Sequence, residues 1–311
     1  MNNVLSPKRE LWLLITLAGI QFTNILDFMI MMPLGPQFTQ LFSITDAQFG
    51  LLVSAYTIAA GLSGLLASTY IDRFDRKRLM LVLYTLFTVA TLACGLASTY
   101  GTLMVARIAA GVFGGVLSAL SQTIVGDIIP FERRGRAMGI VMTSFSVATV
   151  AGVPLGLFLA AHLGWNAPFI GIATMCGLLT CFAAISLPAM NAHLAQQQGA
   201  TAYSRIIETL ADANHQRAFI FSGLLMFAGF TVIPYITIYM QTNVGIKAEQ
   251  VPYIYLCGGI TTLLTARLFG RLTDSFGKFE TFRVLAIAVI VPMMLTTLMP
   301  PRGEMFELIH T

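Results

Sequence analysis

The chain has 311 residues, of which 56% are hydrophobic and 10% are charged, and its formal net charge at pH 7 is +4. A soluble globular domain carries about 25% charged residues, so this composition and a mean hydropathy of +0.78 argue against a water-soluble fold. A net charge of +4 is also not typical of a nucleic-acid-binding protein, and no nucleic-acid partner is expected.

Nine apolar runs are long enough to cross a lipid bilayer as α-helices. A helix needs about 20 apolar residues to span a hydrocarbon core of ~30 Å. The runs lack the two-residue alternation of strands, and the first is too long and wrongly flanked for a cleaved signal peptide. In chain order, the predicted spans are residues 11–32, 47–70, 79–99, 101–125, 137–160, 167–187, 218–241, 250–272 and 281–300.

The basic residues indicate how the spans are oriented. Nine alternating spans place 15 of the 18 lysines and arginines on one side, two on the other and Arg107 within a span. The positive-inside rule makes the first side cytoplasmic, so we expect a multi-pass inner-membrane protein with a cytoplasmic N-terminus. Trp12 and Trp165, near the starts of the first and sixth spans, fit interfacial anchors. The basic residues on the predicted cytoplasmic side are Lys8, Arg9, Arg73, Arg76, Lys77, Arg78, Arg133, Arg134, Arg136, Arg205, Arg217, Arg267, Arg271, Lys278 and Arg283.

One long polar segment, residues 188–217, divides the first six spans from the last three. It lies on the predicted cytoplasmic side and is interpreted as an interdomain linker. The sequence therefore predicts an all-α membrane protein with a six-helix bundle over residues 1–187 and a partial second bundle of three helices over residues 218–311. Residues 301–311 contain no apolar run long enough for a tenth span.

A loop motif occurs twice, after the second span and after the eighth. Residues 270–278 read GRLTDSFGK and fit the frame G-x-x-x-D-x-x-G-[RK], whereas residues 68–76 read STYIDRFDR and depart from it at Ser68 and Asp75. Two copies six spans apart indicate a six-helix unit used twice, as in transporters with parallel repeats. Because aspartate tolerates a positive φ better than most residues, the turn is expected to survive at Asp75.

Three further motifs follow in adjacent spans. The fourth span carries RIAAGVFGG (107–115), the fifth carries GVPLG (152–156), and GWNAPF (164–169) opens the sixth. Together with the loop motif, these residues resemble the major facilitator superfamily, and within it the drug/proton and sugar efflux antiporters. The inserted Val153 resembles the form found in sugar or arabinose-type efflux members.

The resemblance implies a major facilitator-type helical bundle of two six-helix halves. This chain would then contain about nine transmembrane helices: the complete N-terminal half and the first three helices of the C-terminal half. Helices ten to twelve would be missing, as after a frameshift, in a split gene or in a partial sequence, and a separately encoded piece would have to supply them.

Two ionisable residues lie well inside spans, Asp27 in the first and Arg107 in the fourth. At 1.5 Å per residue each lies about 9 Å from the outer end of its span, so the two can meet if the spans are neighbours. Buried charges in a membrane usually face a cavity or a partner. The functional interpretation is that Asp27 takes up and releases a proton while Arg107 modulates its pKa; the alternative is a fixed ion pair that only positions two helices.

The loop motifs supply a second set of candidates at the cytoplasmic span ends. The resemblance implies a latch in which Asp274 faces helix five and Asp72 faces the absent helix eleven, each near a helix N-terminus. The alternative is a solvated turn carboxylate beside arginines. Asp127 is expected to join a cytoplasmic cluster with the arginines of residues 133–136, unless that loop is simply solvated. The candidate latch residues are Asp72, Arg73, Arg76, Lys77, Gly270, Asp274, Gly277 and Lys278.

Gly152, Pro154 and Gly156 form the helix-five motif, which by resemblance controls leak and the direction of transport. Proline frees a backbone carbonyl and bends the helix, whereas the glycines can serve close helix packing alone. Polar and aromatic residues within spans are candidates for a substrate cavity, although such groups also bond to neighbouring helices. The cavity candidates are Gln21, Asn24, Met29, Met32, Tyr56, Thr231, Tyr235 and Tyr239.

The sequence contains no motif of enzyme chemistry. The four cysteines sit in apolar runs without C-x-x-C spacing, and the four histidines are scattered, so no disulfide, metal site or cofactor is expected. No Walker-type GxxxxGK[ST] sequence occurs, which argues against direct use of ATP.

The predicted function is secondary active transport, with proton-coupled efflux of a drug, sugar or related metabolite. A proton symporter for uptake is an alternative of the same class, against which the GVPLG pattern weighs. An inactive or split-gene fragment is an alternative of another class, because a bundle of six helices and half of a second cannot alternate access in the usual way. The expected partners are the small-molecule substrate, protons and the lipid bilayer.

Overall fold

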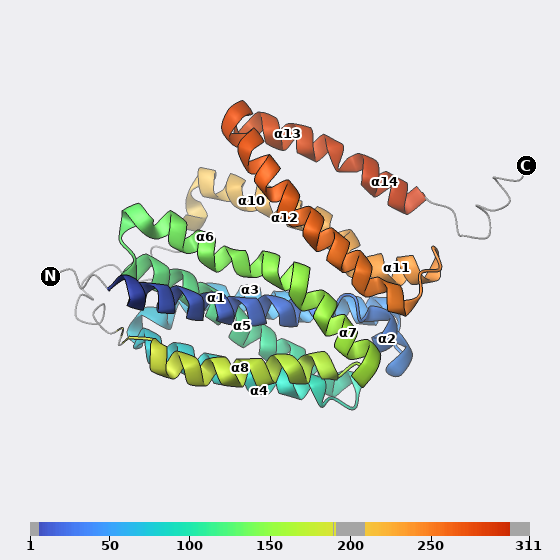
Figure 1. Ribbon diagram of the computed structural model, residues 1–311, viewed down its shortest axis with the longest axis horizontal. Helices are drawn as coiled ribbons and strands as arrows, with labels where there is room; N and C mark the ends of the chain where they lie inside the picture. Colours follow the sequence, from blue (N-terminus) through green and yellow to red (C-terminus); the bar gives the residue numbers. More distant parts are fainter. Residues whose placement is uncertain (1–5, 189, 191–208, 299–311) are drawn as a thin grey trace, which may run out of the picture.

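Every regular element is helical in the part of the chain that the computed structural model describes, residues 6–188, 190 and 209–298 (Figure 1). In the first half, α1 to α8, each predicted span forms one helix or a run of helices. A short helix that the sequence did not predict, α2, follows the first span. The elements are α1 (Pro7–Ile30), α2 (Gly35–Leu41), α3 (Asp46–Tyr70), η1 (Ile71–Arg73), α4 (Arg76–Gly95), α5 (Tyr100–Ile128), α6 (Phe131–Val147), η2 (Ala148–Gly152), α7 (Val153–Leu163) and α8 (Ala167–Ser186).

In the second half, α10 to α14, the predicted spans are more often interrupted by short helical turns and breaks. α10 begins at Ala213, inside the segment predicted as a linker, most of which lies outside the described residues. The predicted spans 250–272 and 281–300 coincide with α12 and with the pair α13 and α14. The elements are α10 (Ala213–Val232), η4 (Ile233–Tyr235), α11 (Ile236–Thr242), η5 (Ala248–Gln250), α12 (Val251–Phe276), α13 (Lys278–Ala288) and α14 (Ile290–Leu298).

Seven stretches of described helix are long and apolar enough to cross a membrane, and they match the first seven predicted spans in order. α12, α13 and α14 are not among these seven, so the eighth and ninth spans stay predictions. The seven stretches are Lys8–Ile30, Asp46–Arg73, Arg76–Gly95, Tyr100–Ile128, Arg133–Leu163, Ala167–Ser186 and Ala213–Thr242.

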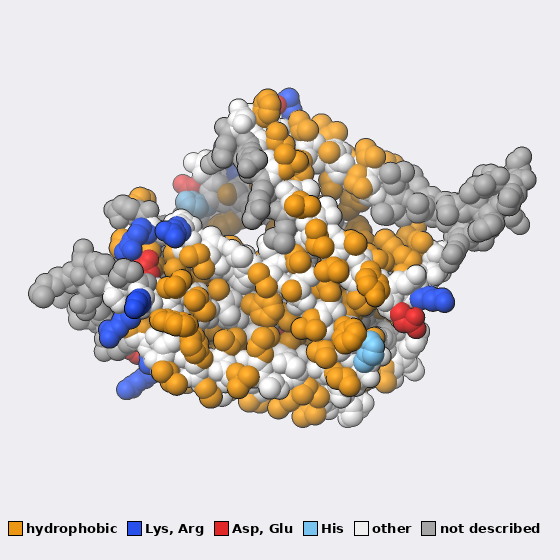
Figure 2. Space-filling model, in the orientation of Figure 1, with side chains coloured by type: hydrophobic (Ala, Val, Ile, Leu, Met, Phe, Trp, Pro, Cys, Tyr) orange, Lys and Arg blue, Asp and Glu red, His pale blue; other side chains and the backbone are white. Residues whose placement is uncertain are grey.

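Basic side chains gather at one end of the first half. Figure 2 shows lysine and arginine side chains where α1 begins, while hydrophobic side chains cover the flank between the two ends. This end, called the basic end below, carries Lys8, Arg76 and Arg133, and the opposite or far end carries Thr45 and Tyr100. Such a distribution is typical of a bundle whose flank faces lipid.

The two tryptophans lie at opposite ends of the first half. Trp12, near the basic end, is 50% exposed and packs edge-on against Phe182 at a centroid distance of 5.7 Å. Trp165, at the far end, packs against Phe38 of α2 at 5.5 Å and Phe42 at 5.8 Å. Trp12 thus keeps the exposure of an interfacial anchor, whereas Trp165 belongs to an aromatic cluster that holds α2 over the bundle.

Asp75 does not form the left-handed turn expected of it. Its φ is −59°, and its carboxylate caps α4 by accepting a hydrogen bond from the Arg78 N–H at 2.8 Å. Gly277, at the equivalent place in the second motif copy, has a φ of +86° and precedes α13. The prediction was wrong because an aspartate can start the next helix by capping it, without the conformation that only glycine adopts freely.

α3 and α5 approach more closely than ordinary side chains would allow. Gly111 and Gly115 of α5 lie against the backbone of Tyr56 and Ala60, where a Cβ atom would collide with a carbonyl oxygen. Small residues permit such close approach of membrane helices. This contact sets the position of α5, and with it that of Arg107.

The fifth span contains a π-helical turn, η2, which ends one residue before Val153 and Pro154 begin α7 and so includes Val150, four residues before the proline. Proline lacks an N–H and its ring clashes with the carbonyl four residues earlier, and the wider turn relieves that conflict. Gly152 and Gly156 face α1, where a Cβ atom would lie 2.9 Å from Leu26 or 2.6 Å from Ile30. Both glycines therefore serve close helix packing.

The two halves converge at the far end and separate toward the basic end (Figure 1). Near the far end the Tyr235 hydroxyl lies against Gly50 of α3, and Gly259 of α12 lies against the Val150 backbone of η2. Toward the basic end, every residue of α10 from 213 to 228 is exposed. The second half is therefore held to the first mainly by its far-end segments.

Candidate functional site

A buried ion pair joins α1 to α5 in the part of the first half nearer the far end. Asp27 and Arg107 have no solvent exposure. Arg107 Nη1 lies 2.9 Å from Asp27 Oδ2 and donates a second hydrogen bond, of 3.2 Å, to the Asp27 carbonyl. The contact predicted from their equal depths is confirmed.

The hydrogen bonding of this pair is incomplete. Within the described part of the chain, Asp27 Oδ1 and Arg107 Nε and Nη2 are buried and have no hydrogen-bond partner of good geometry. Thr91 of α4 adjoins Asp27 and Cys94 adjoins Arg107, and the Thr91 hydroxyl is itself buried without a hydrogen-bond partner of good geometry among the described residues. A buried carboxylate oxygen without a donor is unfavourable, and a proton on that oxygen would remove the charge that burial penalises. The geometry therefore makes the pair sensitive to the protonation of Asp27.

Tyr56 of α3 lies against the Arg107 guanidinium. The Arg107 Cζ atom is 4.3 Å from the centre of the Tyr56 ring, which is a cation–π distance. The Tyr56 hydroxyl donates to Asn24 Oδ1 at 2.6 Å, and Asn24 Nδ2 donates to the Gly114 carbonyl at 2.9 Å. A Cβ atom on Gly114 would lie 2.6 Å from Asn24 and 2.8 Å from Tyr56, so glycine leaves room for this bond.

The polar network continues along α1 toward the basic end. Asn24 Nδ2 also donates to Ser118 Oγ at 3.1 Å, and the Ser118 hydroxyl donates to Gln21 Oε1 at 3.2 Å. Gln21, Asn24 and Asp27 stand three residues apart and so follow one face of α1. Ser118 and Gly114 were not predicted as site residues; their only signal in the sequence is the run of small residues in the fourth span.

The structure divides the predicted cavity residues into two groups. Gln21, Asn24 and Tyr56 are at most 6% exposed and make their hydrogen bonds inside the first half, so they form an internal network and not an open lining. In the second half, Thr231 is exposed and donates to a carbonyl one turn earlier in α10, and Tyr235 is 36% exposed. The remaining candidates, buried or half-buried, are Met29, Met32 and Tyr239.

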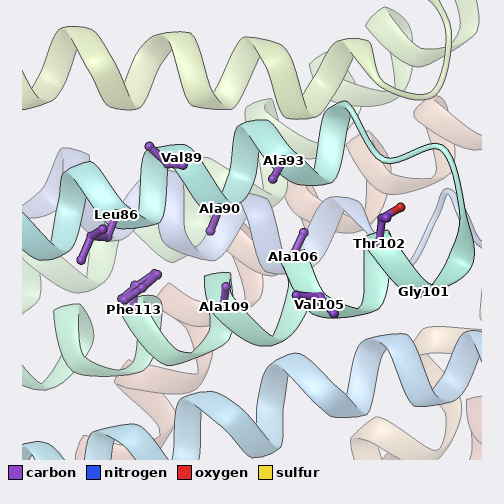
Figure 3. Close-up of a pocket in the computed structure, with 10 residues that line it drawn as sticks. All are labelled: Leu86, Val89, Ala90, Ala93, Gly101, Thr102, Val105, Ala106, Ala109 and Phe113. Atoms are coloured by element: carbon purple, nitrogen blue, oxygen red, sulfur yellow. The ribbon is translucent and has the colours of Figure 1, made fainter.

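An apolar groove of about 500 Å³ lies between α4 and α5, and α4 runs on the side of the first half away from α12 (Figures 1 and 3). Figure 3 shows side chains of the two helices facing each other across it, with Thr102 carrying the one hydroxyl of the lining. None of the predicted cavity residues lines this groove, and its apolar surface suits lipid. The lining residues are Leu86, Val89, Ala90, Ala93, Gly101, Thr102, Val105, Ala106, Ala109 and Phe113.

A second charge cluster lies at the basic end, where Arg76 is buried between two carboxylates. Its Nη2 atom lies 2.6 Å from Asp72 Oδ1 and 3.1 Å from Asp127 Oδ2, and its Nη1 donates to the Ile71 carbonyl at 2.8 Å. Arg76 therefore ties η1 and α4 to the end of α5. Asp127 belongs to this cluster at the basic end because it pairs with Arg76, the last residue of the first loop motif.

The arginines that follow Asp127 have other partners. Arg133 pairs with Glu10 of α1 at 3.0 Å, and Arg134 Nε donates to the Ile129 carbonyl at 2.9 Å. Arg134 thus bonds just beyond the end of α5, two residues from Asp127, whereas Arg133 turns toward α1, and a cluster of these arginines with Asp127 stays a prediction. The Glu10–Arg133 pair was missed, since nothing in the sequence places these two span ends side by side.

The other latch candidates make contacts within the first half or lie where less is described. Lys77 donates to the Leu187 carbonyl at 2.7 Å and so joins α4 to the end of α8. Arg73 is exposed in η1. The predicted contact of Asp274 with helix five stays a prediction. The latch residues for which only the backbone is described are Gly270, Asp274 and Lys278.

The chemistry available at the candidate site is that of one carboxylate, one guanidinium and neutral hydrogen-bonding groups. Among the described residues, no three His, Cys, Asp or Glu side chains come together as a metal site requires. Within this network, Asp27 is the one carboxyl group, and Arg107 is the cation that faces it.

Proteins with related sequences have been identified. The family model of the Major Facilitator Superfamily matches residues 17–306. The uncharacterized MFS-type transporter YtbD of Bacillus subtilis (strain 168) is 26% identical over 81% of this chain and 62% of its own length. A probable sugar efflux transporter of Mannheimia succiniciproducens is 24% identical over 88% of this chain and 67% of its own length. Multidrug resistance protein 2 of Bacillus subtilis is 24% identical over 96% of this chain and 76% of its own length. This chain thus spans less than two thirds of the length of the first of these relatives.

Solved structures share the fold. A bacterial homolog of the human lysosomal transporter Spinster, inward-facing and occupied, aligns with a TM-score of 0.72 and 19% identity over 97% of this chain and 70% of that chain. A D-xylose-proton symporter aligns with a TM-score of 0.66 and 16% identity over 87% of this chain and 70% of the symporter chain. At such identities the likeness establishes the architecture alone.

Proposed function

The chain belongs to the major facilitator superfamily, whose members are transporters and not enzymes, and from this premise we propose that it exports a small molecule in exchange for protons. The observation that carries the proposal is the fully buried Asp27–Arg107 pair, in which Asp27 Oδ1 has no hydrogen-bond partner within the described residues. Asp27 takes up and releases the proton, and Arg107 balances its charge.

Protonation changes the net charge of a site closed to solvent. With Asp27 ionised the pair is neutral, and with Asp27 protonated the site carries the positive charge of Arg107. In a low-dielectric interior a second positive charge is then strongly disfavoured, whereas the ionised state tolerates it. A proton and a cationic substrate therefore compete for the site. A neutral substrate is exchanged if it and the proton favour different conformations.

The fifth span supports export over uptake. Its π-turn contacts both halves, because Gly152 packs on α1 and the Val150 backbone packs on Gly259 of α12. A change in the bend at Pro154 would therefore alter how the two halves approach each other. Because the GVPLG motif resembles that of antiporters, we assign the control of direction to this segment. Uptake by symport is the alternative that the transport test separates.

The basic end is proposed to face the cytoplasm, following the positive-inside rule. The halves separate toward this end, so the exposed residues 213–228 of α10 would lie toward the cytoplasm. A cysteine introduced at the exposed Arg78 should react with a membrane-impermeant reagent only after the cells are opened. Reaction in intact cells would overturn the orientation.

Transport in vesicles tests the proton role. The purified 311-residue chain and its Asp27→Asn variant are reconstituted, loaded with a fluorescent cation or a labelled sugar, and exposed to an imposed pH gradient. Wild type is expected to move one of these probes against the proton flow, and Asp27→Asn to lose the response to the gradient. The matched control is Asp75→Asn, which neutralises a helix-capping carboxylate at the basic end.

Each contrary outcome of this test has a distinct meaning. A gradient response retained by Asp27→Asn would refute Asp27 as the proton site. Movement of the probe together with protons would favour uptake. Transport that requires co-expression of the last three helices of a relative would identify the active unit as longer than this chain, a distinction that matters because the chain spans 62% of the first relative.

A further inference from the structure

A row of aromatic rings leads from the buried ion pair to the second half of the molecule. The Arg107 Cζ atom lies 4.3 Å from the centre of the Tyr56 ring. The Tyr56 ring stacks on Phe28 of α1 at a centroid distance of 5.4 Å and an interplanar angle of 27°. Phe28 in turn lies 5.8 Å from Phe230, which is on α10. Tyr56 is therefore one ring-to-ring contact away from a residue that touches the second half.

The position of Tyr56 is set by its surroundings in the first half. It is 5% exposed, its hydroxyl donates to Asn24 at 2.6 Å, and its backbone lies against Gly111. A residue anchored at both its backbone and its hydroxyl has little freedom to turn its ring away from Arg107. A change in the guanidinium position must therefore be met by the ring or by its stacking partner.

The charged and titratable groups around Asp27 come from four helices. They are Arg107 of α5, Tyr56 of α3, Cys94 of α4 and Cys176 of α8. Arg107 is the cation among them, and Tyr56 is the neighbour that offers it an aromatic face. When Asp27 is protonated, the attraction between carboxylate and guanidinium falls, and the Tyr56 ring and the Asp27 carbonyl remain as partners of the buried charge.

We infer that Tyr56 is a positioning residue that holds Arg107 when Asp27 is neutral and transmits this change to α10 through Phe28 and Phe230. The inference rests on the proposed function, because it takes Asp27 as the proton site. α10 is suited to respond, since it contacts the first half at Phe230, close to the Tyr235 contact of η4, while its residues 213–228 are exposed. A small displacement at Phe230 becomes a larger one at the basic end of the helix.

The inference is tested by measuring the distance between the halves as a function of pH. Spin labels are placed at the basic ends of α6 and α10 through Arg136→Cys and Arg217→Cys, both exposed positions, in the full chain in lipid nanodiscs. The exposed Cys181 and Cys257 are replaced by serine to avoid background labelling. The readout is the shift of the inter-label distance between acidic and neutral pH.

The variants separate the ring, the hydroxyl and the path to α10. Tyr56→Leu removes the ring, Tyr56→Phe keeps the ring but loses the hydroxyl, and Phe230→Leu breaks the contact with Phe28. Phe227→Leu is the matched control, because Phe227 is on the same helix and 74% exposed. Phe230 is itself 37% exposed, so its variant is expected to fold even if Tyr56→Leu does not.

We expect a pH-dependent distance in wild type, its loss in Asp27→Asn, and its reduction to less than half in Tyr56→Leu and Phe230→Leu. Phe227→Leu should keep it, and Tyr56→Phe, which keeps the ring but loses the hydroxyl anchor, should keep more of it than Tyr56→Leu. A full pH response in Phe230→Leu, together with its loss in Asp27→Asn, would overturn the aromatic path and leave the proton site standing. An unchanged response in Asp27→Asn would overturn the proton site itself, and the path with it.

Discussion

The first half of the molecule and α10 of the second half are similarly apolar, yet they pack differently. In the first half, Gly111 and Gly115 bring α5 against the backbone of α3, whereas Gly223 of α10 has open space where a Cβ atom would stand. α10 contains no buried residue. Hydrophobicity places a helix in the membrane, but small residues and paired polar groups decide whether it packs on a neighbour.

One ion pair from each half shows a similar difference in burial. Asp27 and Arg107 are wholly buried, whereas the side chains of Glu280 and Arg283 are 52% and 60% exposed at a similar separation, 2.7 Å against 2.9 Å. Similar contact geometry therefore has different energetic consequences, because burial removes the water that would otherwise solvate an unpaired charge.

The largest expected effect comes from removing one partner of the buried pair. Arg107→Ala leaves the Asp27 carboxylate buried without its counter-ion and should lower the free energy of unfolding by about 3–5 kcal/mol. Arg283→Ala, at the exposed pair, should leave it almost unchanged. Unfolding in mixed micelles, followed by circular dichroism, measures both. Equal losses of unfolding free energy in the two variants would show that burial does not distinguish the Asp27–Arg107 pair from the Glu280–Arg283 pair.

Alanine substitutions at a packed glycine and at an unpacked glycine should change the free energy of unfolding in opposite directions. Gly115→Ala places a Cβ atom against the Ala60 backbone and should destabilise the protein by about 1–3 kcal/mol. Gly223→Ala meets nothing within 4 Å and should stabilise α10 by about 0.5–1 kcal/mol, since alanine favours the helix over glycine. The same unfolding assay applies, and a destabilising Gly223→Ala would show that this face of α10 is covered in the membrane.

The Arg76 cluster should show coupling between its two carboxylates. Asp72 and Asp127 have side chains 55% and 40% exposed, so Asp72→Asn and Asp127→Asn should each cost less than about 1 kcal/mol of unfolding free energy. Together they leave the buried Arg76 without a carboxylate, and the double variant should exceed the sum of the singles by about 0.5–3 kcal/mol. If the double variant loses only the sum of the two single losses of unfolding free energy, Arg76 is solvated at the basic end.

The smallest effect is expected at the N-terminus of α10. Hydrogen bonds from the N–H and ring of His215 and from the N–H of Asn214 hold the pKa of Asp212 below its ordinary value. A lowered folded-state pKa means that the cap is fully present above the ordinary value and is lost as pH falls through the lowered one. Amide exchange at Asn214 and His215 should therefore quicken in Asp212→Ala, and the extra pH dependence of protection at low pH should disappear in this variant.

The features that the sequence predicted well depend on residues close together along one helix. The first seven spans follow from runs of apolar residues, and the gathering of basic side chains at one end follows from which loops carry them. The contact between Asp27 and Arg107 could be predicted because the depth of a residue in the membrane follows from the number of residues between it and the end of its span. The apolar runs could not reveal α2, whose seven residues are too short to show a period.

Only the tertiary structure decided which faces of the helices meet. It placed Asn24 and Tyr56 inside a closed network, gave Arg133 to Glu10, and left α10 exposed toward the basic end. These outcomes depend on how each helix is rotated about its axis and how it crosses its neighbours. The composition of a single span does not specify either quantity, because an apolar helix in lipid can present any face to a partner until small residues and polar pairs select one.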